Sequence, residues 1–208
     1  MRPLIFYDVK YYYEIALNGY TYDMIHAFQP GFPLLIKLIT GFTKMSLQKF
    51  VIAAFGINWI LGISTIFYLG KMLGNLTTNP FLIRLTLMIF IFNPVSIYYI
   101  AGYSESLFMF IQTLGAYMIT ERIKKKSFDL LSAVKISAVF SLGALVRSNG
   151  FLSVFFLIYF YLIYNHKWTV MSTIKEGMIS MGLLVMNLTP FVLYVKFSEH
   201  IICKLNND

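Results

Sequence analysis

Long apolar stretches separated by short polar turns dominate the chain from residue 50 onward. The clearest is residues 50–69, where about 20 uncharged residues at 1.5 Å each give roughly 30 Å of helix, enough to cross a bilayer. These stretches are too long and too irregular in polarity for the strands of a membrane barrel. The pattern predicts about six membrane-spanning helices, at residues 50–69, 81–100, 106–120, 128–146, 151–164 and 174–195.

Two of these predicted helices contain a proline, Pro94 in the second and Pro190 in the last. Proline lacks the backbone N–H of a helical hydrogen bond, and its ring crowds the preceding turn. We therefore expect a kink near Phe92 and Asn93, and a softened last helix.

The segment before residue 50 has a different pattern, because charged residues and many tyrosines interrupt its apolar positions. Residues 34–45 form a short apolar run with Lys37 and Lys44 near its edges, which suits a helix lying in the membrane interface. The sequence thus predicts two regions: a loop with an interfacial helix at residues 1–49, and a transmembrane helical region at residues 50–208.

Composition supports this class of fold. Hydrophobic residues make up 58% of the 208 residues and charged residues only 12%, and the mean hydropathy is +0.70. Soluble domains carry a smaller apolar share, and disordered chains lack the apolar surface to offset the entropy of ordering. The sequence therefore predicts an all-α integral membrane protein.

The net charge of +8 is informative mainly through the positions of the charged residues along the chain. Lys and Arg lie between the apolar runs, where they act as topology signals, so a nucleic-acid partner is not expected. The densest basic cluster, at residues 121–126, is cytosolic by the positive-inside rule. Alternating the spans then puts residues 1–49, 102–105 and 147–150 on the opposite side of the membrane.

Acidic residues number only nine, so those on that opposite side deserve separate consideration as chemical groups. Asp8 precedes a run of tyrosines, and it can serve as a solvated helix cap or as a general base for a hydroxylated substrate. Glu105 follows Ser104 at the start of a predicted helix. Helix capping explains both residues, and contact with a polar substrate at the tip formed with Tyr103 is the alternative.

Arg147, Ser148 and Asn149 form a compact set of hydrogen-bond donors at another turn on that side. A guanidinium group binds phosphate through two parallel hydrogen bonds, although a headgroup contact at a helix end is an equally good interpretation. His26 and His200 are too far apart in sequence for a metal motif, as is His166, and no phosphate-binding glycine loop is present. Neither a metal site nor an ATP site is predicted.

Six short motifs together resemble a known family, the phosphatidylinositol-glycan class V mannosyltransferases of GPI-anchor assembly. The resemblance covers nearly the whole chain, since the motifs occur in the family's order and spacing. They are Phe6-Tyr7-Asp8, Gly19-Tyr20-Thr21-Tyr22, Ala27-Phe28-Gln29-Pro30-Gly31-Phe32-Pro33, Phe92-Asn93-Pro94, Ala101-Gly102-Tyr103-Ser104-Glu105-Ser106 and Val146-Arg147-Ser148-Asn149-Gly150.

The resemblance implies a multi-span enzyme of the endoplasmic reticulum membrane with part of a GT-C glycosyltransferase fold and a site facing the lumen. Such enzymes use dolichyl-phosphate-mannose as donor and add the second mannose, in α1,6 linkage, to mannosylated glucosaminyl-phosphatidylinositol, the GPI precursor. No cofactor is implied. Membrane lipid is an expected partner, and the need for an accessory membrane subunit stays open.

For individual residues, the resemblance implies that Asp8 is the acidic catalytic residue, with Tyr7 in place of the family's usual tryptophan. The implied substrate contacts are Tyr7, Tyr103, Glu105, Arg147, Ser148 and Asn149. In the family a transmembrane helix precedes this acid and further spans follow the region of Cys203. We therefore expect the chain to be an incomplete copy, lacking the first span and the C-terminal part.

The alternative is a non-catalytic membrane protein, either a scaffold subunit or a fragment of a transporter. In a transporter, the intramembrane residues Arg84 and Lys135 would line a path across the membrane. Charged residues of a transporter gather near the midplane, whereas the polar candidates here gather near one surface.

Overall fold

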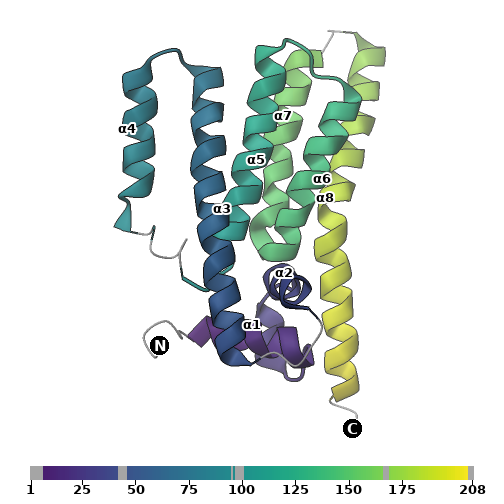
Figure 1. The fold of residues 1–208 in the computed structure, drawn as a ribbon. Coiled ribbons are helices and arrows are strands. Elements are labelled where there is room, and N and C mark those ends of the chain that lie inside the picture. Colours follow the sequence, from purple (N-terminus) through teal and green to yellow (C-terminus); the bar gives the residue numbers. More distant parts are fainter. Residues whose placement is uncertain (1–6, 42–45, 95, 97–100, 166–168, 206–208) are drawn as a thin grey trace.

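A computed structural model describes residues 7–41, 46–94, 96, 101–165 and 169–205. Within this part of the chain every regular element is helical, which confirms the predicted all-α fold class (Figure 1). The helices are α1 (Tyr7–Asn18), η2 (Asp23–Ala27), α2 (Gly31–Thr40), α3 (Leu47–Leu76), α4 (Pro80–Ile91), α5 (Glu105–Lys124), α6 (Leu130–Val146), η4 (Ser148–Leu152), α7 (Ser153–Asn165) and α8 (Val170–Leu205).

Local sequence signals explain where α3 and α4 begin. The Ser46 side chain accepts a hydrogen bond from the backbone N–H of Lys49 at the start of α3. Asn79 accepts from two N–H groups at the start of α4, and Pro80 occupies the first turn, where its missing N–H costs nothing.

Within the described residues, three stretches are long and apolar enough to cross a membrane: Leu47–Leu76, Ser148–Asn165 and Val170–Cys203. The helices Pro80–Ile91 and Leu130–Val146 are apolar but shorter. The predicted spans therefore overlap α3 through α8, but α5, at the third predicted span, belongs to neither group, and the number of crossings stays a prediction.

The predicted kink at Pro94 is wrong, because α4 ends at Ile91 and Phe92 is its C-cap. A helix cannot continue into a proline without losing a hydrogen bond, and here the chain leaves the helix before that point. Residues 97–100, the end of the predicted span, lie outside the described residues. Pro190, by contrast, lies inside α8, whose helix runs through it.

The segment before residue 50 contains more helix than we predicted. The interfacial helix expected at residues 34–45 begins three residues earlier, as α2, and ends at Thr40, while residues 42–45 lie outside the described part. A further helix, α1, precedes it. Both lie across one end of the bundle of long helices (Figure 1).

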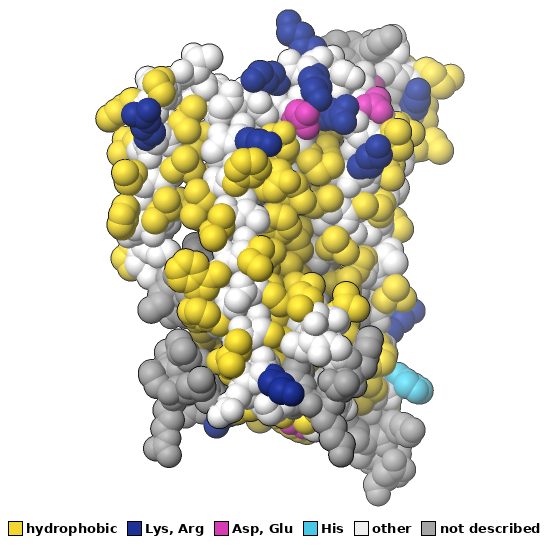
Figure 2. Space-filling model, viewed as in Figure 1, with side chains coloured by type: hydrophobic (Ala, Val, Ile, Leu, Met, Phe, Trp, Pro, Cys, Tyr) yellow, Lys and Arg dark blue, Asp and Glu magenta, His cyan; other side chains and the backbone are white. Residues whose placement is uncertain are grey.

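The basic cluster lies at the other end of the molecule. Helix α5 has Glu105 at its first residue and Lys124 at its last, so these residues are about 30 Å apart along the axis. Figure 2 shows most of the visible Lys and Arg side chains at this end, with hydrophobic surface between the two ends. The arrangement agrees with the predicted sidedness, although which end faces the lumen stays a prediction.

Two hydrophobic cores hold the elements together. One joins α1, α2 and α3 and includes Val9, Phe32 and Phe50, all fully buried. The other joins α5 to α8 around Phe140 and Leu157. Helices α3 and α5 pack side by side, and this contact connects the two cores.

Candidate functional site

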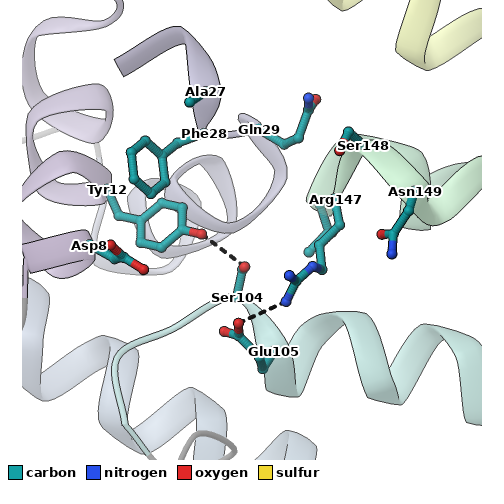
Figure 3. Close-up of a pocket in the computed structure, with 11 residues that line it drawn as sticks. Asp8, Tyr12, Ala27, Phe28, Gln29, Ser104, Glu105, Arg147, Ser148 and Asn149 are labelled. Atoms are coloured by element: carbon teal, nitrogen blue, oxygen red, sulfur yellow. Dashed lines mark hydrogen bonds and ion pairs between the residues drawn. The ribbon is translucent and has the colours of Figure 1, made fainter. Parts of the chain in front are cut away.

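A cavity of about 310 Å³ lies where α1, the loop before α2, the start of α5 and the turn between α6 and η4 meet (Figure 3). In Figure 3, Asp8 and Tyr12 lie on one side of the cavity, Arg147 lies on the other, and Ser104 and Glu105 lie between them. The lining residues are Asp8, Tyr12, Ala27, Phe28, Gln29, Ser104, Glu105, Val146, Arg147, Ser148 and Asn149.

Asp8 and Tyr12 are presented by one face of α1, because residues four apart in a helix are neighbours. Partial burial raises the pKa of the Asp8 carboxyl, and the positive charge of Arg147 opposes that rise. The Tyr12 hydroxyl donates a hydrogen bond to Ser104 Oγ over 2.8 Å. Burial also raises the pKa of Tyr12 to about 12, so its hydroxyl stays a neutral donor.

Arg147 and Glu105 form an ion pair in the cavity, with 2.7 Å between Arg147 Nη1 and Glu105 Oε1. The guanidinium also lies over the ring of Phe108, 5.8 Å from its centroid. The Arg147 side chain remains 41% exposed, so part of its donor fork faces the cavity. Glu105 Oε2 is buried without a hydrogen-bond partner in the structure, which leaves an acceptor for a ligand.

The turn that carries Arg147 depends on the close packing of Gly150 against Gly143. Helix α6 ends at Val146, and Arg147 is extended, with its N–H bonded to the carbonyl of Gly143. Helix η4 then folds back on α6 so closely that a Cβ on Gly150 would lie 2.2 Å from backbone atoms of Gly143. A side chain at residue 150 is therefore incompatible with this turn.

Asn58 of α3 positions the residues that lead into α5. This side chain is fully buried and donates hydrogen bonds to the carbonyls of Ala101 and Tyr103, the second over 2.9 Å. Gly102 packs against Val9 of α1, which brings the loop close to α1. Ser104 and Glu105 follow directly, so Asn58 determines where they enter the cavity.

The loop before α2 is held from two sides. Tyr20 donates a hydrogen bond to the Phe28 carbonyl over 2.7 Å, and Tyr194 of α8 donates to the carbonyls of His26 and Phe28. The Phe28 ring stacks on Tyr11, with 4.9 Å between centroids. This loop brings Gln29 into the wall of the cavity.

Gln29 adds a second unused acceptor. It is only 7% exposed, and its Oε1 atom is buried without a hydrogen-bond partner in the part of the chain that the structure describes. A buried amide oxygen of this kind is costly unless a ligand or water satisfies it. The cavity thus combines two carboxylates, a guanidinium and neutral acceptors, a set that suits a ligand carrying both phosphate and hydroxyl groups.

Of the residues predicted from sequence, Asp8, Glu105, Arg147, Ser148 and Asn149 line this cavity together. Tyr103 is outside the set of lining residues and contributes its carbonyl to the contact with Asn58. Tyr7 is the first residue of α1, and its side chain lies outside the described part of the structure.

Sequence reasoning missed Tyr12, Phe28 and Gln29 in the cavity wall and Asn58 behind it. The available signal for Asn58 was that it is the only amide side chain in the apolar stretch 50–69. A lone amide in such a stretch is expected to bind a backbone group of a neighbouring element.

The transporter alternative gains no support from the residues that suggested it. Arg84 and Lys135 are both exposed on the outer surface of their helices, where they cannot line an internal path. Among the described residues, no group of three His, Cys, Asp or Glu side chains is arranged to hold a metal ion.

Comparison with known proteins gives consistent matches. The family model described as mannosyltransferase (PIG-V) matches residues 1–206. No solved structure matches the chain significantly.

Among curated proteins, GPI alpha-1,6-mannosyltransferase 2 of Cricetulus griseus is 30% identical over 162 residues, and that of Rattus norvegicus is 31% identical over 162 residues. GPI mannosyltransferase 2 of Schizosaccharomyces pombe is 26% identical over 154 residues. Each alignment covers 74% of this chain and 30% of the relative. The chain therefore spans about a third of the length of these relatives.

Proposed function

The chain belongs to the mannosyltransferase (PIG-V) family, and from this premise we propose that it transfers the second mannose of the GPI anchor. In this proposal the donor is dolichyl-phosphate-mannose, and the acceptor is the GPI precursor that already carries one mannose. The new linkage is α1,6, and the reaction takes place on the lumenal face of the endoplasmic reticulum membrane. The names of the curated relatives support the linkage and the acceptor.

One observation carries the proposal: a carboxylate with a raised pKa and an arginine with free donor capacity line the same cavity. These are the two groups that sugar transfer from a phosphate-linked donor requires. One removes the proton from the attacking hydroxyl, and the other stabilises the departing phosphate.

Asp8 is the proposed general base. The acceptor hydroxyl attacks the anomeric carbon of the donor mannose and gives its proton to the Asp8 carboxylate, while the bond from that carbon to the phosphate oxygen breaks. The bonding electrons leave with the phosphate. Attack opposite the leaving group converts a β-linked donor into an α-linked product in a single displacement, so one carboxylate is sufficient.

Arg147 is the proposed phosphate-binding residue. Negative charge accumulates on the phosphate as it departs, and a pre-positioned guanidinium stabilises that charge without reorganisation. The ion pair with Glu105 holds the guanidinium in place, and Ser148 and Asn149 lie beside it to add donors. Because the phosphate leaves as an anion, no general acid is needed.

The free acceptor atoms fit the sugar. Gln29 Oε1 and Glu105 Oε2 are buried and have no hydrogen-bond partner among the described residues, and a mannose presents several hydroxyl donors. Hydrogen bonds from the sugar would satisfy both atoms and fix the ring with its anomeric carbon between Asp8 and Arg147. A scaffold protein would gain nothing from these unsatisfied atoms.

A transfer assay tests the proposal. Membranes are prepared from cells that lack their own second GPI mannosyltransferase and express this protein, then supplied with dolichyl-phosphate-[³H]mannose. We expect label in a GPI precursor with two mannoses, removable by an α1,6-specific mannosidase. Absence of this product, or transfer from a nucleotide-linked mannose in membranes that cannot form the dolichol-linked donor, would contradict the proposal.

A further inference from the structure

A second cavity, of about 300 Å³, adjoins the polar one and has an apolar lining. Helices α2, α5 and α6 form its walls. We call it the α2–α5–α6 groove, and its lining residues are Gly31, Leu34, Leu35, Leu38, Leu107, Ile111, Leu142, Leu145 and Val146.

The groove is continuous with the polar cavity. Val146 lines both, and it directly precedes Arg147. Glu105 lies in the polar cavity, while Leu107 and Ile111, further along α5, lie in the groove. From the guanidinium of Arg147, the groove therefore extends along α5 and α6 toward the middle of the bundle.

The groove also opens onto the lateral surface of the molecule. Leu34 is 56% exposed, Leu38 is 67% exposed and Leu142 is 52% exposed. In a bilayer, such apolar side chains lie against lipid tails. A hydrocarbon chain can therefore enter the groove sideways from the membrane while its headgroup stays in the polar cavity.

We propose that the α2–α5–α6 groove holds the first isoprenoid units of the lipid-linked sugar donor, beside the phosphate bound by Arg147. This inference rests on the proposed function. In a polyprenyl-phosphate sugar, the prenyl chain is attached directly to the phosphate, so a chain-binding groove has to start next to the phosphate-binding residue. In the acceptor, inositol and sugar residues separate the lipid from the reacting hydroxyl, so its acyl chains lie further from this cavity.

Another apolar cavity, of about 250 Å³, lies between α3 and α4 and fits this role less well than the α2–α5–α6 groove. Its lining includes Trp59, Ile63 and Phe90 and has no residue in common with the polar cavity. It is the natural control, because it is also apolar and lipid-accessible but is not adjacent to Arg147.

The groove orients the donor more than it attracts it. Lipid tails are as apolar as leucine, so moving a chain from the bilayer into the groove gains little hydrophobic free energy. What the walls supply is shape. A chain fixed along α5 and α6 holds the attached phosphate and sugar in one orientation, which favours in-line attack.

Photolabelling tests this inference independently of transfer. The full chain in lipid nanodiscs is irradiated with a polyprenyl phosphate that carries a diazirine in its first isoprene units, and labelled residues are mapped by mass spectrometry. We expect label on the groove residues of α5 and α6. Leu142→Trp, which fills the groove from an exposed position, is expected to lower this labelling at least fivefold.

Ile63→Trp is the matched control, because Ile63 is 61% exposed and lines the α3–α4 cavity. It is expected to leave the labelling unchanged. Label concentrated in the α3–α4 cavity, label spread evenly as for bulk lipid, or label insensitive to Leu142→Trp would overturn the inference. Mannose transfer separates the two proposals: labelled groove without transfer contradicts the proposed function alone, and transfer without groove labelling contradicts the groove alone.

Discussion

Asp8 is the residue whose electrostatic environment matters most for the proposed chemistry. Partial burial raises its pKa above the ordinary value of an aspartate, while the charge of Arg147 limits the rise. A carboxylate with a raised pKa is a stronger base once it is deprotonated. In the proposed mechanism Arg147 therefore has two effects: it binds the phosphate, and its charge limits the rise in the Asp8 pKa.

The pH dependence of transfer follows from these two effects. Because the base has to be deprotonated, the acidic limb of the rate profile should lie above pH 3.8 in the unmodified protein. In Arg147→Gln the opposing positive charge is gone, so the Asp8 pKa rises further and the acidic limb moves to higher pH. The residual transfer rate, measured between pH 4 and pH 8, checks this; an acidic limb that stays in place or moves to lower pH would refute the coupling.

At the scale of elements, the turn from α6 into η4 is the feature that brings Arg147 into the cavity. Gly150→Ala places a methyl group 2.2 Å from backbone atoms of Gly143, and the backbone there cannot yield as a flexible side chain can. We expect the overpacking to lower the free energy of unfolding by about 1–3 kcal/mol and to reduce transfer. Thermal unfolding in detergent and the transfer assay measure the two effects.

Gly177→Ala is the matched control for this substitution. Gly177 lies within α8, and a Cβ there meets no atom within 4 Å. Alanine is the better helix former, so this variant should be as stable as the unmodified protein or slightly more stable. Equal behaviour of the two variants would mean that the close contact at Gly150 is unimportant.

Some of the helices could be predicted from the sequence and others could not. Helices of the apolar region were predictable because long uncharged stretches have only one stable form in a membrane. Helix α1 was not predicted, because its tyrosines were counted as polar positions that interrupt an apolar pattern. Val9, Tyr12 and Ala16 nevertheless follow a helical spacing and are buried. A proline can either kink a helix or end it, and the sequence around Pro94 does not distinguish the two. The end of α4 before Pro94 was therefore not predictable.

The site was predictable to a different extent. Glu105 and Arg147 stood out as charged residues at turns between apolar helices, and Asp8 as an acidic residue before a run of tyrosines. The structure places all three around one cavity. Tyr12 and Gln29 could not be found this way, because a tyrosine or a glutamine in a polar segment is unremarkable until tertiary contacts bury it. Their contribution depends on packing between elements that are far apart in sequence.

At the scale of the whole molecule, charge and polarity separate along the long axis. The basic cluster lies at one end of α5 and the candidate site at the other. Positive charge favours the cytosolic side of a membrane, so this separation predicts a site that faces the lumen. A lumenal site suits a lipid-linked donor, which needs no nucleotide sugar from the cytosol.

Cysteine labelling in sealed microsomes tests this orientation. In a Cys203→Ser background, Lys125→Cys should react with a membrane-impermeant maleimide, because Lys125 is exposed at the basic end. Asn149→Cys, exposed beside the cavity, should react only after the membrane is permeabilised. The opposite pattern, or equal labelling of both in sealed vesicles, would contradict the predicted sidedness.

The central claim is that the cavity around Asp8 is where mannose is transferred, and one comparison tests it most directly. Asp8→Asn keeps the size of the side chain but removes the base, while Glu14→Gln makes the same chemical change on the same helix, away from the cavity. With both variants at equal levels in the membrane, Asp8→Asn should lower the rate of mannose transfer by about 10²–10⁴-fold, and Glu14→Gln should leave it near that of the unmodified protein. An unchanged rate in Asp8→Asn would contradict the account.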